Sequence, residues 1–322
     1  MPDDWRPSAS VAALRRRAEL LALVRRFFDA RGVIEVETPV LVRDAVTDIH
    51  LESFAVHYEG PRAPVDGRLW LQTSPEYAMK RLLAAGSGPV FQICRAFRAG
   101  ERGRLHNPEF TLLEWYRPGF DHRAMMDEVA ALAGALLPGR AVGSIRYRDA
   151  FLRHAGIDPF VVADGDLAAA AGRHTDAATV AALSRDGRLD LIMGSVVAPA
   201  LGRDSLCFLT DFPASQAALA RLEPDDPDVA RRFELFVDGI EIANGFHELS
   251  DAQEQRRRFR SDRAVRQARG EAVPEIDERL LAALAAGLPD CAGVALGLDR
   301  LFMLALGAAS IDEVMAFPAE RA

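Results

Sequence analysis

The 322-residue sequence predicts an α+β protein in which a mainly antiparallel sheet is flanked by helices. Two hairpin patterns support this prediction. The first places alternating strands on either side of a polar loop between Phe91 and Tyr116, and the second joins two apolar runs through Asp238-Gly239. The third observation is a helix pattern from Val11 to Phe28, whose apolar residues recur at helical spacing.

The overall charge argues against a general nucleic-acid or membrane-surface binder. Lys and Arg total 39 and Asp and Glu total 47, so the net charge is −8. A chain of this balance has no overall attraction to anionic polymers. The only lysine, Lys80, follows Met79 rather than Gly, which excludes a phosphate-binding loop of the Gly-Lys-Ser/Thr kind.

The cysteines and the N-terminal residues predict a reducing, cytoplasmic location. Cys94, Cys207 and Cys291 are far apart and odd in number, so they form neither a disulfide framework nor a zinc-binding spacing. The N-terminal stretch has no apolar core of the signal-peptide type, and no apolar run reaches the length of a membrane span. We therefore expect no membrane association.

The first elements are a capped helix and a strand. Ser8 or Ser10 is a suitable N-cap for the first helix, and Gly32 is suited to its C-terminal end. The β-branched run from Val33 to Val42 predicts a strand, which Pro39 restricts to a sheet edge. The helix and edge strand suit a subunit interface, although they could equally cover the sheet.

The middle of the chain predicts further elements in order. Leu69 to Thr73 is a short strand, and Ser74-Pro75-Glu76 opens the helix that follows it. A second helix is expected from Met125 to Leu137. The Ala-rich stretch from Asp164 to Arg188 predicts a small helical insertion, and Leu206 to Thr210 predicts a return to strand.

The first hairpin carries the residues most suited to bind an anion. Arg98 lies on the strand face away from the larger apolar side chains, and the loop that follows contains Arg102, Arg104 and His106. On the second strand, alternation places Phe110, Leu112, Glu114 and Tyr116 on one face. This pattern fits a nucleotide site, and it equally fits an ordinary hairpin with a solvated basic loop.

The second hairpin brings two carboxylates to one face. An ideal turn at Asp238-Gly239 pairs Val237 with Ile240, Phe236 with Glu241 and Glu234 with Ala243. Glu234 and Glu241 are then diagonal neighbours about 7–8 Å apart at the backbone, near enough to share a divalent ion. Solvated carboxylates on an outer face are the alternative interpretation.

The last third of the chain predicts an Arg-rich helix and a second anion site. Ser250 and Asp251 are suited to cap the helix, whose arginines form a solvated face rather than a nucleic-acid patch. The strand Gly293 to Gly297 then runs into a helix from Leu298 to Leu306, whose first turn contains Arg300. Free backbone N–H groups and the Arg300 charge both favour a phosphate there.

These pieces together resemble the catalytic domain of class II aminoacyl-tRNA synthetases. The three signatures occur in chain order, at Gly32 to Leu41, at Phe97-Arg98 to Phe110, and at Gly297 to Arg300. The resemblance sharpens to lysyl-tRNA synthetase through Ser74 to Tyr77, His106 to Tyr116 and Glu241 to Leu249. It implies one catalytic domain over residues 1–322, with the insertion at about 141–203.

One expected absence narrows the resemblance further. The first helix begins within ten residues of Met1, so we expect no anticodon-binding domain before it. With the runs at 46–51, 212–220 and 293–308, the chain is similar to truncated paralogues of lysyl-tRNA synthetase. The resemblance implies ATP-dependent activation of (R)-β-lysine or lysine, transfer to a lysine of elongation factor P as acceptor, a homodimer and no stable tRNA binding.

The resemblance also implies a role for each site residue. Arg98 holds the α-phosphate and the substrate carboxylate, and Arg300 holds the γ-phosphate; these two are the catalytic residues. Further ATP-binding residues are Gly100, Glu101, His106, Asn107, Phe110, Glu241, Ile242 and Gly297. Glu234 and Glu241 hold Mg²⁺. Substrate-binding residues are Ser74, Glu76, Tyr116, Asn244, Glu248 and Ala295, with Glu76 on the amine beside the carboxylate and Glu248 with Tyr116 on the terminal amine.

Two departures from lysyl-tRNA synthetase bear on specificity. Ala295 stands where those enzymes usually have Gly, so its methyl group could reshape the pocket for a displaced amine. Gly100 occupies the place of the usual adenine-reading Glu, and Glu101 comes one residue later.

A minimal tRNA-charging enzyme and a non-catalytic amino-acid-binding regulator are the alternative functions, and the retained Arg98, Glu241 and Arg300 argue against the second.

Overall fold

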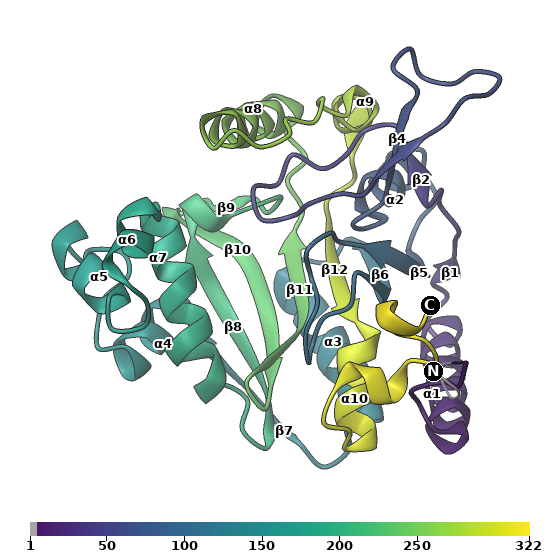
Figure 1. Ribbon diagram of the computed structural model, residues 1–322, viewed down its shortest axis with the longest axis horizontal. Helices are drawn as coiled ribbons and strands as arrows, with labels where there is room; N and C mark the ends of the chain where they lie inside the picture. The colour runs from purple at the N-terminus through teal and green to yellow at the C-terminus, as the bar shows by residue number, and fades with distance from the viewer. Residues whose placement is uncertain (1–4) are drawn as a thin grey trace. The chain divides into compact units, whose positions relative to one another are not determined.

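The computed structural model describes residues 5–322, and the chain divides into two compact units. The first unit comprises the chain up to Phe120 together with Leu249–Ala322. The second comprises Asp121–Glu248. Figure 1 shows the helices and strands of both units.

The first unit contains two sheets. In this unit the strands of the larger sheet are β1 (Ile34–Glu35), β5 (Val90–Phe97), β6 (Glu109–Pro118) and β12 (Cys291–Gly297). β5 pairs antiparallel with β6, and β6 with β12, whereas β1 runs parallel to β5 at the edge. The smaller antiparallel sheet has the order β2 (Leu41–Val42), β4 (Arg68–Leu71) and β3 (Ala55–His57).

The helices of this unit are α1 (Val11–Asp29), α2 (Glu76–Ala84), α8 (Ala252–Ala268), α9 (Glu278–Gly287), α10 (Leu298–Leu306), and the short 3-10 helices η4 (Ile311–Val314) and η5 (Ala319–Arg321). The Ser10 hydroxyl caps α1 by accepting from the Ala13 amide at 3.1 Å, as predicted. Gly32 follows with a φ of +64°, the left-handed conformation that favours glycine. Both predicted ends of the first helix are confirmed.

Aromatic packing fixes α1 on the larger sheet. The Phe28 ring stacks on Phe91 of β5 at a centroid distance of 4.4 Å and meets Trp115 of β6 edge-on at 5.2 Å. All three side chains are buried. Such ring pairs add about 0.5–1.5 kcal/mol each beyond the area that they bury.

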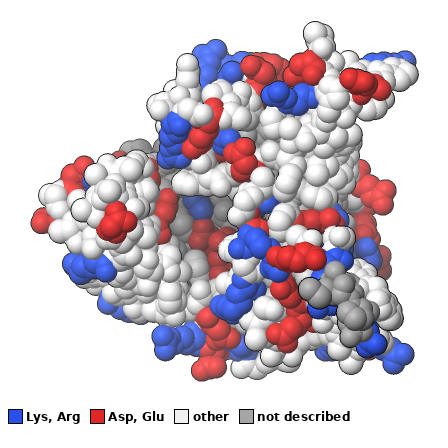
Figure 2. All heavy atoms as spheres, in the orientation of Figure 1, with Lys and Arg blue, Asp and Glu red and all other residues white. Residues whose placement is uncertain are grey.

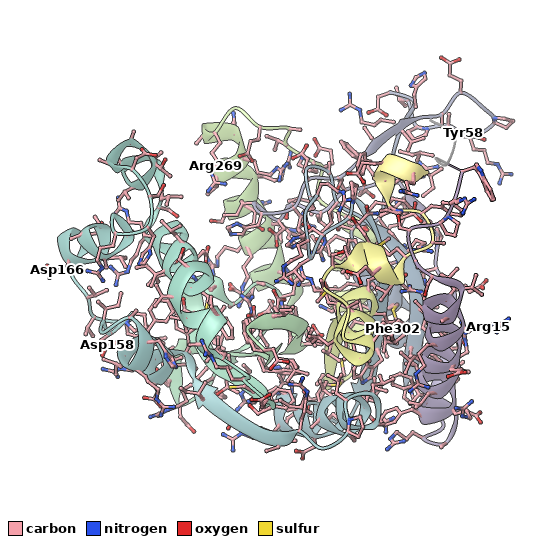
Figure 3. All side chains as sticks on the ribbon, turned by 60° about the horizontal axis from the view of Figure 1, so that its bottom comes forward. Arg15, Tyr58, Asp158, Asp166, Arg269 and Phe302 are labelled. Atoms are coloured by element: carbon pink, nitrogen blue, oxygen red, sulfur yellow. The ribbon has the colours of Figure 1, made fainter. Side chains whose placement is uncertain are left out.

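A buried polar network joins α1, β6 and α10, and α1 and α10 lie side by side in Figures 1 and 3. The Arg17 guanidinium pairs with Asp299 at 2.7 Å and donates to the Thr111 hydroxyl at 2.8 Å. The Thr111 amide in turn donates to Asp299 at 2.6 Å. The network holds the first turn of α10, where Arg300 lies, against the sheet.

The strands of the second unit follow the order β11 (Ile240–His247), β10 (Asp226–Val237), β8 (Ser205–Pro213) and β7 (Ala141–Arg146), with β9 (Leu222–Glu223) beside β10. Its helices are α3 (His122–Leu136), α4 (Tyr147–His154), α5 (Asp164–Ala171), α6 (Ala177–Ala182), α7 (Arg185–Ile192) and the short η1 (Met193–Val197), η2 (Ala198–Ala200) and η3 (Ala214–Gln216). Tyr147 packs against Phe151 and Phe212 at 4.6 and 5.1 Å in a core separate from that of Phe28.

The α+β class with mainly antiparallel strands is confirmed, and three details of the sequence analysis were wrong. The run Val33–Val42 forms two short strands, β1 and β2, in different sheets, because Pro39 interrupts it. The insertion at about 141–203 opens with a strand, β7, rather than a helix. Helix α9 had no predicted counterpart.

The second hairpin forms at the predicted turn, with one change of register. Asp238 and Gly239 have φ values of +50° and +77°, as a primed two-residue turn requires. Val237 pairs with Ile240 and Phe236 with Glu241 as expected. A bulge between Leu235 and Phe236 then shifts the ladder, so Glu234 pairs with Asn244 and not with Ala243.

The charged side chains are mixed on the face shown in Figure 2, where basic and acidic groups are interspersed. Within residues 5–322, no helix is long and apolar enough to cross a membrane. All three cysteines are free thiols.

Candidate active site

A buried carboxylate on β6 forms the centre of a polar cluster in the first unit. The Tyr116 hydroxyl donates to Oε1 of Glu114 at 2.6 Å, and the Ser74 hydroxyl donates to Oε2 at 2.8 Å. The Ser74 hydroxyl also accepts from the Glu76 amide at 3.0 Å, at the start of α2. Glu114 and Tyr116 are each only 2% exposed. The cluster brings together two predicted substrate-binding residues, Ser74 and Tyr116.

Strand register explains how this cluster forms. Glu114 and Tyr116 are two residues apart on β6, so their side chains share one face of the sheet. Glu114 lies opposite Ala295 of β12 on one side and Gln92 of β5 on the other. The sequence pattern placed Glu114 on the same face as Tyr116 but gave it no role, because the contact of its other oxygen with Ser74 comes from a turn forty residues away.

Burial keeps the nearby Cys94 thiol protonated. It raises the pKa of Cys94 on β5 to about 12, and the neighbouring Glu114 charge contributes to the shift. The thiol is therefore protonated at neutral pH and is a poor nucleophile. The chemistry of this face depends on its charged and hydroxyl groups.

Glu76 is held by the only lysine of the chain. Lys80 Nζ lies 2.5 Å from Oε1 of Glu76, one helical turn away on α2. The Lys80 side chain is 2% exposed and that of Glu76 is 16% exposed. The ion pair fixes the orientation of the predicted amine-binding carboxylate.

Arg98 provides a cation beside an aromatic ring. Its guanidinium carbon lies 5.0 Å from the centre of the Phe110 ring, and its Nη1 is 3.8 Å from the carboxylate of Glu101. The Arg98 Nε is buried without a hydrogen-bond partner. A buried N–H of this kind is costly unless an acceptor meets it, as an anionic ligand oxygen would.

Arg300 contacts the loop between β5 and β6. Its Nη2 lies 2.6 Å from Nε2 of His106, and its Nε donates to the Leu105 carbonyl at 3.2 Å. The N-cap of α10 is Gly297, whose lack of a side chain leaves the first-turn amides without a side-chain cap. Arg300 and these amides together favour an anion.

The loop residues differ in what their side chains do. Gly100 adopts a φ of +78°, and an added Cβ would meet nothing within 4 Å. Glu101 lies between Arg98, at 3.8 Å, and His106, at 4.0 Å. Asn107, a predicted ATP-binding residue, is buried; its side-chain amide donates to the Glu109 carbonyl at 2.6 Å, and its side-chain oxygen accepts from the Ala319 amide at 3.0 Å. Its side chain thus anchors the loop.

The second unit brings two carboxylates together. Burial raises the pKa of Glu234 to about 7, opposed by Arg232 and reinforced by the charge of Glu241. Arg232 donates to Oε1 of Glu234 at 2.5 Å and to the amide oxygen of Asn244 at 3.2 Å. The electrostatic link between Glu234 and Glu241 agrees with the predicted shared face.

The carboxylate pair fits Mg²⁺ chemically. Within residues 5–322 no group of three or more His, Cys, Asp or Glu side chains could hold a metal. Mg²⁺ usually takes only one or two protein carboxylates and completes its shell with water and phosphate oxygens. A cation here would also offset the Glu241 charge, which adds to the effect of burial in raising the Glu234 pKa.

Of the remaining predicted residues, Ile242 and Gly297 lie on strands, and Glu248 directly follows β11. Ile242 is buried on β11 beside the bulge, and Gly297 pairs with Leu112 at the end of β12. Glu248 is 1% exposed, and its carbonyl accepts from the Arg221 side chain at 3.0 Å.

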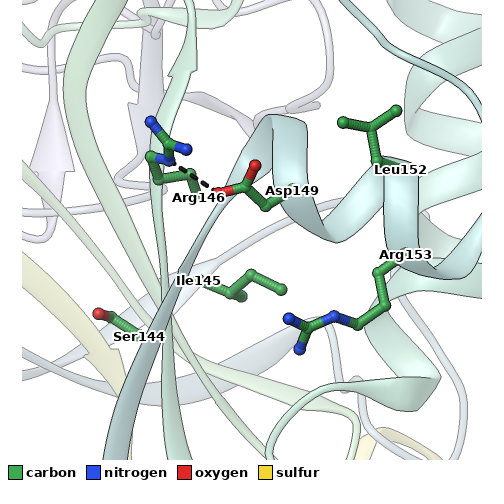
Figure 4. A pocket seen from close by; sticks show the side chains of 6 residues that line it. All are labelled: Ser144, Ile145, Arg146, Asp149, Leu152 and Arg153. Carbon is green, nitrogen blue, oxygen red and sulfur yellow. Dashed lines mark hydrogen bonds and ion pairs between the residues drawn. The ribbon is translucent and has the colours of Figure 1, made fainter.

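Two cavities contain few of the predicted site residues. A depression of about 620 Å³ on the second unit is lined by Ser144, Ile145, Arg146, Asp149, Leu152 and Arg153, and Figure 4 shows Arg146 paired with Asp149 across it. A cavity of about 290 Å³ in the first unit includes Gln72 to Pro75, and its lining lacks Glu76, Glu114 and Tyr116. Of the predicted site residues, only Ser74 lines either cavity.

Comparison with known proteins assigns these signatures to a family. A model of the class II tRNA synthetases (D, K and N) matches residues 4–321. The chain is 52% identical over 320 residues to proteins named elongation factor P–(R)-β-lysine ligase from Salmonella typhi, from Salmonella paratyphi B and from Salmonella dublin. Each alignment covers 99% of this chain and 98% of the relative.

Proposed function

Because this chain belongs to the class II tRNA synthetases of the D, K and N group, we propose that it activates (R)-β-lysine with ATP and transfers it to a lysine of elongation factor P. The observation that carries the proposal is the 52% identity, across nearly the full length of both chains, to ligases of that name. The Ser74, Glu114 and Tyr116 cluster supports it, since a substrate with two ammonium groups requires buried acceptors.

The first step is attack of the substrate carboxylate on the α-phosphorus of ATP. A carboxylate oxygen bonds to that phosphorus, the bond to the bridging oxygen breaks, and pyrophosphate leaves with the electron pair. Negative charge accumulates around the α-phosphate, so fixed cations lower the barrier. Arg98, whose guanidinium lies beside the Phe110 ring and whose Nε has no hydrogen-bond partner, is assigned to that phosphate, and Arg300 to the γ-phosphate.

The second step is acyl transfer. The acceptor lysine amine attacks the carbonyl of the adenylate, the amide bond forms, AMP leaves, and the amine loses a proton. No protein nucleophile is needed, which agrees with the protonated state of Cys94. The protein contributes mainly by holding the reactants in line.

Substrate recognition is assigned to carboxylates. Glu76 is proposed to bind the amine beside the substrate carboxylate, and Tyr116 and Glu248 the terminal amine, as the family resemblance implies. Glu114 joins the set because it is bound to both Ser74 and Tyr116. Each charge-assisted contact contributes about 1.5–3 kcal/mol.

Mg²⁺ is proposed to bind at Glu234 and Glu241, where it would neutralise phosphate charge. Arg232 bonds Oε1 of Glu234 and so competes with the cation for that oxygen. Ile242 and Asn244, on the same strand as Glu241, are proposed to border the nucleotide and the substrate carboxylate respectively.

We propose a cytoplasmic homodimer. Three free thiols support a reducing compartment. Ile34 and Leu41 support an interface near the first signature, since they expose 54% and 41% of their surfaces. In sedimentation velocity, Leu41→Asp should dissociate the dimer, whereas Leu152→Asp, a similarly exposed leucine of the second unit, should not.

The decisive experiment supplies purified protein with ATP, Mg²⁺ and labelled (R)-β-lysine, with either elongation factor P or bulk tRNA. Label should appear on elongation factor P and depend on ATP. Label on tRNA alone would identify a minimal tRNA-charging enzyme and overturn the proposal. Labelled α-lysine in a parallel reaction decides which isomer is used.

A further inference from the structure

We infer that Arg102 is a positioning residue that holds the loop from Arg98 to Pro108 in its ATP-binding arrangement, through ion pairs to Asp312 and Glu320. The inference rests on the proposed function of that loop. The sequence analysis noted Arg102 only as one of several basic loop residues, and the family signatures assign it nothing.

The Arg102 guanidinium is bound on every side. Its Nε and Nη2 contact the two carboxylate oxygens of Glu320 at 2.5 and 2.7 Å. Its Nη1 and Nη2 contact those of Asp312 at 3.2 and 2.9 Å. Two bidentate pairs on one planar group fix both its position and its orientation.

The same guanidinium also closes the tip of the loop. Nη1 donates to the carbonyls of Gly103 and His106 at 3.1 and 3.3 Å. Gly103 and His106 form an isolated antiparallel β-bridge. The Gly103 amide donates to the His106 carbonyl at 3.0 Å, and the His106 amide donates to the Gly103 carbonyl at 3.2 Å. Arg102 therefore joins the tip to the segment from Ile311 to Arg321.

The tip leads directly to the proposed phosphate-binding group. The His106 ring lies 2.6 Å from Arg300, and Arg300 also binds the Leu105 carbonyl. Fixing the His106 carbonyl with Arg102 thus fixes the partner of Arg300. This is the route by which a residue that touches no substrate could affect ATP.

The loop needs such an attachment at one end more than at the other. Asn107 and Arg104 already tie the second half to Ala319 and Ala309 by hydrogen bonds of 3.0 and 3.2 Å. The first half contains Gly100, whose positive φ and open surroundings allow many conformations. The Arg102 side chain ties this half to Asp312 and Glu320, outside the loop.

The expected effect is on ATP affinity. If the loop of Arg102→Met holds the ATP-binding arrangement in only a fraction of the molecules, the apparent Kd for ATP rises by the inverse of that fraction. We expect the Kd for ATP, measured by calorimetry, and the KM for ATP to rise about three- to tenfold. The kcat should change less than twofold, because bound ATP restores the same loop.

A matched control separates this role from an ordinary surface ion pair. Arg256 makes a bidentate pair with Glu278 at 2.7 and 2.5 Å, and the exposures of the two side chains, 35% and 63%, resemble the 31% and 59% of Arg102 and Glu320. Arg256→Met should leave ATP affinity unchanged. Arg102→Lys, which keeps the positive charge but cannot form the bidentate pairs, should give an intermediate ATP affinity.

Two further measurements complete the test. Amide hydrogen exchange at residues 99–107 of the unliganded protein should accelerate in Arg102→Met but not in Arg256→Met. Asp312→Asn with Glu320→Gln should reproduce the ATP affinity of Arg102→Met, and adding Arg102→Met should weaken binding no further.

The outcomes distinguish this inference from the proposed function. An ATP Kd within twofold of the unsubstituted protein in Arg102→Met would overturn the inference, even if exchange accelerates. Normal ATP binding without transfer to elongation factor P would overturn the function and leave the Kd comparison valid. Failure of the unsubstituted protein to bind ATP would overturn both.

Discussion

The Ser74 hydroxyl donates a 2.8 Å hydrogen bond to Oε2 of Glu114, which joins the turn before α2 to the middle of β6. Tyr116 occupies the other oxygen of the same buried carboxylate. A substrate ammonium at this buried carboxylate would form a charge-assisted hydrogen bond with it.

Glu114→Gln should weaken (R)-β-lysine binding. The amide retains an acceptor but loses the charge, so the KM for (R)-β-lysine in ATP–pyrophosphate exchange should rise about 10- to 100-fold. The KM for ATP should stay nearly constant. Ser87→Ala, which removes an ordinary hydroxyl-to-carbonyl bond after α2, serves as the control and should change neither KM. A proportional rise in both KM values would indicate general damage to the site.

Ala295→Gly should shift the preference between lysine isomers. Ala295 lies directly opposite Glu114 in the β6–β12 register, so loss of its methyl group should open space beside the carboxylate. We expect the ratio of kcat/KM for α-lysine to that for (R)-β-lysine to rise at least several-fold, on the order of 1 kcal/mol.

Ala292→Gly provides the matched control for that comparison. It lies on the same strand, but its odd spacing from Ala295 places it on the opposite face. Both substitutions carry the cost of glycine in a strand, so only the pocket differs. An unchanged isomer ratio in Ala295→Gly would contradict the proposed role of the methyl group.

Glu234 should make stability depend on pH. Its pKa in the folded protein is raised to about 7, above the ordinary value of 4.5. Between these values the folded state binds more protons than the unfolded state, so the free energy of unfolding falls as pH rises. Denaturant unfolding of Glu234→Gln from pH 5 to 8 should show a flatter profile than the unsubstituted protein. Parallel profiles would rule out this assignment.

Asp299→Asn should destabilise the first unit. The Arg17 and Asp299 side chains are 13% and 4% exposed, and removal of one charge leaves the other buried. We expect a loss of about 2–3 kcal/mol in the free energy of unfolding, measured with urea. Glu19→Gln, which breaks the exposed Arg16–Glu19 pair with side-chain exposures of 56% and 64%, should change it by less than about 0.5 kcal/mol. Equal effects in both variants would show that burial adds nothing here.

Local features of the fold were predictable because local rules govern them. Ser10 and Asp251 cap their helices because their side-chain oxygens accept hydrogen bonds from nearby backbone amides. The Asp238-Gly239 turn forms because both residues tolerate a positive φ. The bulge beside Leu235 was not predictable, since it depends on how two strands pack rather than on the turn between them.

The sequence by itself determined the α+β class, the two hairpins, the helix caps and, through its signatures, the family, whereas the roles of the site residues stay predictions. Only the tertiary structure showed that Glu114 joins Ser74 to Tyr116, that Asn107 anchors the loop, and that Arg102 reaches Asp312 and Glu320. The physical reason is range. Caps and turns depend on neighbours within about four residues, whereas Ser74 and Glu114 are 40 residues apart and Arg102 and Glu320 are 218 residues apart.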